Sequence, residues 1–156
     1  MSTRPFAPFA LFLALPLAAA FAAPARAGEL HDVTPGPGKT TVGTPGKATL
    51  TLAAKNGWHL NPDAPISVKL SPADGVTVDK AKLGRKDLAA STPEKARFDV
   101  GFAATSPGAK TIECETSFVI CQESACKPIK ETVTLNVDVL AAGAAPAAGA
   151  GAKKKH

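Results

Sequence analysis

The sequence predicts an all-β fold in which one domain forms an antiparallel β-sandwich. Several short stretches alternate apolar and polar side chains, which is the period of a strand with one buried face. Turn dipeptides separate these stretches, among them Pro45-Gly46, Asn56-Gly57 and Pro107-Gly108. Such residues either fix φ at about −65° or permit a positive φ. No segment carries apolar side chains at the spacing of a helical face, so we expect strands throughout.

The turns set the order of the predicted strands. The first strand lies between Pro45-Gly46 and Asn56-Gly57, and the second follows the Asn61-Pro62 turn. Residues 72–75 separate the second from the third, and Pro107-Gly108 separates the fourth from the fifth. A sixth strand closes the domain. The predicted strands are Ala48–Lys55, Ile66–Leu70, Val76–Lys82, Arg97–Ala104, Lys110–Cys121 and Glu131–Leu140.

The foldable region, about Glu29–Leu140, has the size of one ordinary domain. Short strands separated by turns in a chain of this length are typical of an immunoglobulin-like sandwich. We therefore assign residues 28–140 to a single immunoglobulin-like β-sandwich domain.

The N-terminal segment has the three parts of a secretory signal peptide. Arg4 precedes an apolar stretch over residues 6–23, and small residues follow at Ala25 and Ala27. The apolar stretch is shorter than the roughly 20 residues of a spanning helix, and prolines interrupt it. We expect residues 1–27 to be cleaved, which predicts an exported protein with no stable membrane span in its mature form.

Residues 141–156 form the other end. Apart from the basic tip, this segment contains only Ala, Gly and Pro, which offer no side chains for a core, so we expect a disordered tail. The formal net charge of +5 arises from Arg4, Arg26 and the lysines at positions 153–155, and the rest of the chain is near neutral. The absence of a basic patch on the domain argues against a nucleic-acid partner.

Three cysteines carry the chemistry of the chain. In the strand Lys110–Cys121, Cys114 and Cys121 lie an odd number of positions apart, so an unbroken strand points them to opposite faces. Cys114 belongs with the apolar face and is expected to be a buried, inert thiol. A connection over residues 122–128 places Cys121 and Cys126 at its base, where a hairpin brings them within disulfide distance.

The function of that pair has more than one reading. A bridge that closes a short loop at a strand end constrains the unfolded chain little, which favours a reactive pair over a structural one. Lys127 and Lys130 are placed to stabilise a thiolate, and Glu123 opposes them. A metal site from Cys121, Cys126 and His59 is a weaker alternative. His59 itself follows an aromatic residue and is expected to be packed or to cap a turn.

Two segments resemble the N-terminal periplasmic domain of the thiol:disulfide interchange protein DsbD and its stand-alone relatives. One is Gly57-Trp58-His59-Leu60-Asn61, and the other runs from Phe118 through Cys121 and Cys126 to Pro128. The resemblance covers about Thr49–Val139 and implies an immunoglobulin-like sandwich that cycles between dithiol and disulfide. The family's cap loop corresponds to about Gly84–Lys95, which contains no aromatic residue here.

The resemblance implies catalytic cysteines at Cys121 and Cys126, with no cofactor and no metal. Its implied partners are thioredoxin-like or membrane redox proteins, which supply electrons, and oxidised periplasmic proteins, which receive them. Either cysteine of the pair could form the mixed disulfide. The alternative is a non-enzymatic binding or structural domain in which the disulfide serves as a clip.

Overall fold

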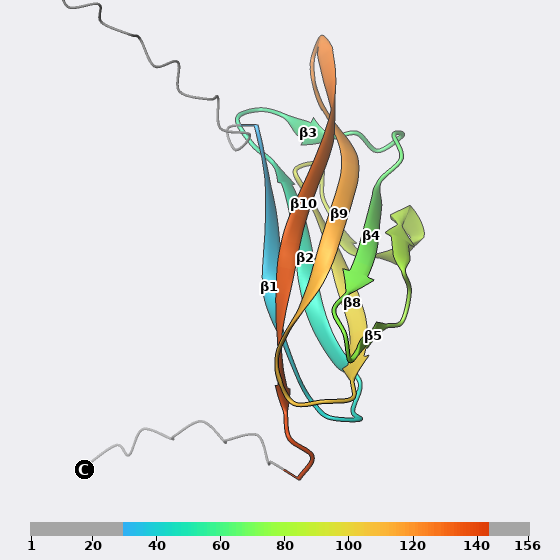
Figure 1. The fold of residues 1–156 in the computed structure, drawn as a ribbon. Coiled ribbons are helices and arrows are strands. Elements are labelled where there is room, and N and C mark those ends of the chain that lie inside the picture. Colours follow the sequence, from blue (N-terminus) through green and yellow to red (C-terminus); the bar gives the residue numbers. More distant parts are fainter. Residues whose placement is uncertain (1–29, 144–156) are drawn as a thin grey trace, which may run out of the picture.

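In a computed structural model that describes residues 30–143, the chain is an all-β, immunoglobulin-like β-sandwich (Figure 1), which confirms the predicted fold class. A single 3-10 turn, η1 (Arg85–Asp87), interrupts the strands of this part of the chain. No helix within it is long and apolar enough to cross a membrane. The strands are β1 (His31–Thr41), β2 (Gly46–Ala54), β3 (His59–Leu60), β4 (Ser67–Pro72), β5 (Val76–Val78), β6 (Lys82–Gly84), β7 (Leu88–Ser91), β8 (Lys95–Ala104), β9 (Gly108–Gln122) and β10 (Ala125–Leu140).

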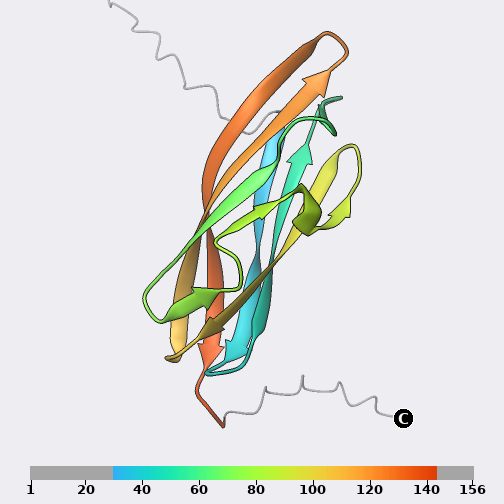
Figure 2. The same cartoon turned by 90° about the vertical axis from the view of Figure 1, so that its right-hand side faces the viewer.

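The strands form one hydrogen-bonded path in the order β5-β8-β2-β1-β10-β9-β4-β6, with β3 added to β9 and β7 added to β8. This path curls on itself, so β10, β9 and β4 lie in one layer and β2, β8 and β5 in the other (Figures 1 and 2). All pairs are antiparallel except β1 with β10.

The core lies between the two layers and follows the alternation in the sequence. On β9 every second side chain from Ile112 to Ile120 is buried, and β2 and β8 supply the facing side chains. Burial of such apolar area stabilises the fold by about 25 cal/mol per Å². The largest fully buried apolar side chains are Phe98, Phe102, Phe118, Leu50, Leu52, Ile112, Ile120, Leu135, Val68, Val100 and Val137.

Strand β1 was not predicted, and it joins the two layers. His31 to Gly36 pair with β2, Gly38–Thr41 pairs with β10 in parallel, and Lys39 also pairs with Lys47 of β2. The register shifts between Gly36 and Lys39, where Pro37 supplies no N–H donor. A Cβ on Gly38 would lie 2.8 Å from atoms of Phe102 and Val137, so the strand crosses the core edge where no side chain fits.

Gly38→Ala is therefore expected to lower the free energy of unfolding by about 1–3 kcal/mol, because the added methyl overpacks a closed core. Gly84→Ala is the matched control, since the nearest atom to its added Cβ is the Ile66 carbonyl oxygen at 3.8 Å. Chemical denaturation checks both variants. Equal unfolding midpoints for the two would contradict this account of the β1 crossing.

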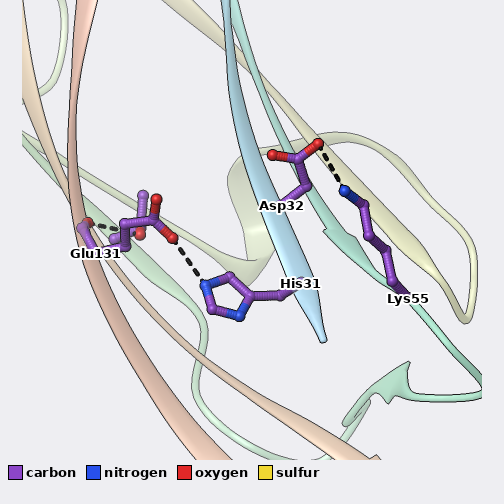
Figure 3. Close-up of polar contacts among 5 residues, drawn as sticks. His31, Asp32, Lys55 and Glu131 are labelled. Atoms are coloured by element: carbon purple, nitrogen blue, oxygen red, sulfur yellow. Dashed lines mark hydrogen bonds and ion pairs between the residues drawn. The ribbon is translucent and has the colours of Figure 1, made fainter. Parts of the chain in front are cut away.

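A partly buried hydrogen bond between His31 and Glu131 ties the first residue of β1 to β10 at the edge where these strands are not paired. His31 is 6% exposed, and its Nε2 lies 2.8 Å from Oε2 of Glu131 (Figure 3). The imidazole also packs edge-on against Phe118, with ring centroids 5.8 Å apart. Next to it, the exposed pair Asp32–Lys55 joins β1 to the end of β2 (Figure 3). The His31–Glu131 contact thus joins β1 to β10 where no backbone pairing does so.

Two predicted boundaries were wrong. Val76–Lys82 is not one strand: β5 pairs with β8, whereas β6 pairs with β4 in the other layer. The crossing lies between Asp79, whose N–H donates to the Gly101 carbonyl of β8 at 3.0 Å, and Ala81, whose carbonyl accepts from the Leu70 N–H of β4 at 2.8 Å. The closing strand begins at Ala125 rather than at Glu131. The predicted signal peptide lies outside the described residues, as does all but the start of the predicted tail.

The Cys121–Cys126 disulfide and its surroundings

The β9–β10 hairpin carries the disulfide. Cys121 and Cys126 are directly opposite in its register, and Gln122 pairs with Ala125, so the turn itself is Glu123-Ser124. The sulfur atoms are bonded, which confirms the predicted Cys121–Cys126 pair. The predicted connection over residues 122–128 is thus a two-residue turn between strands that continue past the disulfide.

The predicted connection extended to Pro128, because proline is rare inside a sheet, but Pro128 lies within β10. Here it is tolerated because β1 pairs with β10 only from Val137 onward. Within the described residues, this part of β10 has β9 as its one paired neighbour, so the missing N–H faces no strand. The hairpin tip projects beyond the rest of the described domain (Figures 1 and 2).

The two cysteines of the bridge differ sharply in exposure. Cys121 is 7% exposed, whereas Cys126 is an exposed residue. The difference arises from β3, which pairs with β9 so that His59 lies opposite Cys121 and Leu60 opposite Ile120. On the other strand of the hairpin no comparable segment is paired beside Cys126 in the described region. An attacking thiolate therefore reaches the sulfur of Cys126 more readily than that of Cys121.

Asn61 makes a hydrogen bond to the shielded sulfur. Its Nδ2 donates to Sγ of Cys121 at 3.3 Å. Its Oδ1 accepts from the backbone N–H groups of Asp63 at 2.8 Å and Ala64 at 3.1 Å, and its own N–H donates to the Val119 carbonyl at 2.9 Å. Because two N–H donors occupy Oδ1, the amide is oriented with its NH₂ group toward the sulfur. Asn61 was predicted as part of a resembling segment, not as a site residue.

Trp58 and Lys127 contact each other near the disulfide end of the hairpin. Trp58 is 9% exposed, and Nζ of Lys127 lies 5.3 Å from the centroid of its ring, within the range of a cation–π contact. Neighbouring strand residues point to opposite faces, so Lys127 is directed away from the face that carries Cys126. Its ammonium lies over the ring of Trp58 and supports the packing of that side chain.

His59 is an exposed residue of β3, so the first of its two predicted roles, packing in the core, was wrong. The described part of the chain contains no group of three or more His, Cys, Asp or Glu side chains placed to hold a metal ion. The region matched to the cap loop, Gly84–Lys95, forms η1, β7 and the turn into β8. The tip of that turn lies against β3, because the Leu60 N–H donates to the Pro93 carbonyl at 2.6 Å.

Cys114 is the free cysteine of this region, and it is fully buried as predicted. Its Sγ donates to the Ile112 carbonyl at 3.6 Å. Burial, and to a smaller degree the adjacent Glu113 carboxylate, raises the pKa of the Cys114 thiol from its ordinary value of 9.0 to about 11. The thiol therefore stays protonated and unreactive at neutral pH.

This raised pKa predicts a loss of stability in alkali. The unfolded chain loses the thiol proton near pH 9, whereas the folded chain retains it to about pH 11. The unfolded state then binds fewer protons, so the free energy of unfolding falls through this window, by roughly 2–3 kcal/mol. Cys114→Ser should flatten the decline in denaturation curves recorded between pH 8 and pH 11. An equally steep decline in that variant would contradict the assignment.

Comparisons with known proteins reveal neither a family nor a curated relative. No family model matches the chain, and no curated protein matches it. Solved structures with a similar outline include WR4, a C. elegans MSP family member (13% identity, 73% of this chain and 99% of that chain, TM-score 0.36). Others are AggA, the major subunit of aggregative adherence fimbriae type I from Escherichia coli (13%, 70% and 95%, TM-score 0.37), and a PapD-like domain of human CEP192 (13%, 88% and 100%, TM-score 0.39). At these TM-scores, the similarity to solved structures adds no information about the fold beyond the strand order described above.

Proposed function

We propose that this protein is a periplasmic thiol:disulfide exchange module that passes electrons between protein partners through Cys121 and Cys126. The observation that supports the proposal is the asymmetry of the bridge. Cys126 is exposed, whereas Cys121 is shielded and its sulfur accepts a hydrogen bond from Asn61. A disulfide with one accessible sulfur and one stabilised leaving group suits directed exchange.

The exchange proceeds in two displacements. A partner thiolate attacks Sγ of Cys126, a new intermolecular S–S bond forms, and the electron pair of the old bond goes to Sγ of Cys121. The second thiol of the partner loses its proton and attacks the partner sulfur of the mixed disulfide, which releases the Cys126 thiolate. The module gains two electrons and, at equilibrium, two protons, and the partner becomes a disulfide. The reverse sequence reduces an oxidised protein.

The proposed electron donors are thioredoxin-like or membrane redox proteins, and the acceptors are oxidised periplasmic proteins. This assignment rests on the resemblance of the segments around Trp58 and Cys121 to the N-terminal domain of DsbD. The periplasmic location rests on the signal-like pattern of residues 1–27.

A second candidate function is a binding or structural domain in which the disulfide is a clip. It is favoured by the position of the bridge where the hairpin tip projects beyond β3, because a two-stranded tip is marginally stable without a third strand. Under this reading, replacing both cysteines melts the tip and leaves the partner interaction otherwise intact.

Reduction by a thioredoxin-like dithiol protein distinguishes the two functions. The oxidised protein is mixed with one equivalent of reduced thioredoxin, and the thiols are trapped by alkylation and located by mass spectrometry. The proposal predicts labels on Cys121 and Cys126 within seconds under native conditions, with Cys114 unlabelled. Labelling that requires denaturant would support the clip.

A further inference from the structure

A groove lies beside the shielded half of the disulfide. It has a volume of about 420 Å³ and runs between the β3 segment at residues 59–62 and the η1, β7 and β8 segments at residues 85–96. This volume falls in the range of ligand pockets. Most of its lining is apolar, contributed by Leu60, Pro62, Ile66, Leu88, Pro93 and Ala96.

Hydrogen bonds hold both walls of the groove in place. The Leu60 N–H donates to the Pro93 carbonyl, which fixes the β7–β8 turn against β3. On the other side, the Arg85 guanidinium donates to the backbone carbonyls of Asn61 at 3.3 Å and of Ala64. The groove is thus formed before any ligand arrives, which reduces the entropic cost of binding.

The charge at the groove is positive and uncompensated. The Arg85 guanidinium donates to neutral carbonyl oxygens, and no carboxylate lines the groove. The acid of the same 3-10 turn, Asp87, is committed elsewhere: it accepts from Lys80 Nζ at 2.5 Å and from the Gly84 N–H at 2.9 Å. These bonds hold the pKa of Asp87 below its ordinary value, so it stays ionised and paired with Lys80. The guanidinium therefore favours a carboxylate on whatever occupies the groove.

The groove also adjoins the reacting sulfurs. Asn61 lines it and donates to Sγ of Cys121, and His59 lines it and pairs with Cys121 across the sheet. A chain that leaves the groove past Asn61 therefore arrives at the disulfide, where Cys126 is exposed. One kind of ligand would satisfy the apolar lining, the Arg85 guanidinium and the nearness of the groove to the disulfide.

We propose that the groove binds an extended apolar segment of the redox partner that carries an acidic side chain a few residues from the exchanging cysteine. The inference rests on the proposed exchange function and specifies its partner. The carboxylate pairs with Arg85, apolar side chains cover Leu88 and Pro93, and the partner sulfur is delivered to Cys126.

The test compares peptide thiols that differ in one group. Capped peptides hold one cysteine, flanking leucines, and Glu or Gln two, three or four residues from the cysteine. Each opens the disulfide of the full oxidised protein, and the thiol released at Cys121 is trapped and quantified over time. At the best spacing we expect the Glu peptide to react about fivefold faster than the Gln peptide, the size of one partly exposed ion pair.

Variants on the same 3-10 turn assign that preference to Arg85. Arg85→Gln should reduce the preference to less than twofold, whereas Lys86→Gln, the matched control outside the groove, should retain it. Arg85→Glu should reverse it in favour of a Lys peptide, a result that local unfolding cannot produce.

Dithiothreitol and glutathione separate the possible failures. If dithiothreitol opens the native disulfide equally in all variants but no peptide shows a charge preference, the groove proposal is overturned and exchange stands. If dithiothreitol fails to open the native disulfide, exchange itself is overturned. If free glutathione shows the same dependence on Arg85 as the peptides, the ligand is a small acidic thiol and the protein-segment proposal is overturned.

Discussion

Cys121→Ser should turn the protein into a trap that holds its redox partner on Cys126, whereas Cys126→Ser should trap at least 100-fold more slowly. The remaining thiol of the first variant is exposed and forms a mixed disulfide that no internal cysteine resolves. The remaining thiol of the second lies 7% exposed behind β3 and must be uncovered before it reacts. Both variants are reduced and mixed with a thioredoxin-like protein that retains one active-site cysteine, held as a mixed disulfide with thionitrobenzoate. Attack by the module's thiolate releases thionitrobenzoate and leaves no second partner thiol to resolve the adduct, which is followed on non-reducing gels.

Both substitutions are made in a protein that already lacks the Cys114 thiol, so that each variant has one cysteine. Cys114→Ser removes that thiol while retaining a hydroxyl donor toward the Ile112 carbonyl, so the core is little disturbed. Parent and variants should show the same thermal unfolding midpoint within a few degrees. Equal trapping rates for the two single-cysteine proteins would contradict the roles assigned from their exposure.

Asn61→Asp should slow opening of the disulfide by about 10-fold to 100-fold at pH 7. The Nδ2–H donor to Sγ of Cys121 is replaced by an anionic oxygen, so the departing thiolate loses a hydrogen bond and gains a repulsive neighbour. A hydrogen bond to a charged group contributes about 1.5–3 kcal/mol, and each 1.4 kcal/mol changes a rate about tenfold. Stopped-flow mixing of the oxidised variant with excess dithiothreitol measures the effect.

This substitution preserves the turn that Asn61 caps. One carboxylate oxygen still accepts from the Asp63 and Ala64 N–H groups, so the 61–64 turn is retained. Asn61→Ala removes the cap and the donor together and should also lower the melting temperature. A rate for Asn61→Asp equal to that of the parent protein would show that the 3.3 Å contact does not assist the leaving thiolate.

The parts of the fold that local pattern determines were predictable. The alternation on β9 placed Cys114 in the core, and the nearness of Cys121 to Cys126 across a hairpin predicted their bond. β1 was not predicted, and its parallel pairing depends on β10, a strand distant in sequence. The division of Val76–Lys82 between two layers likewise depends on tertiary structure, because it is set by the pairing of β5 with β8 and of β6 with β4.

The same distinction applies to the site. The cysteine pair was visible in the sequence, but its asymmetry was not, because β3 shields Cys121 from 60 positions away. The sequence did single out the segment from Gly57 to Asn61, without assigning the amide of Asn61 to the sulfur. Arg85 carried no signal at all, since its role depends on the turn at residues 61–64 that positions it.

The reduction potential of the Cys121–Cys126 pair tests the central claim most directly. The protein is equilibrated in glutathione buffers of graded ratio, its thiols are trapped with acid and alkylation, and mass spectrometry locates the labels. A reactive exchange pair predicts a potential between about −120 and −270 mV, the span of dedicated exchange proteins. A potential below about −300 mV, typical of structural bridges, would contradict exchange and assign the disulfide to the stability of the hairpin.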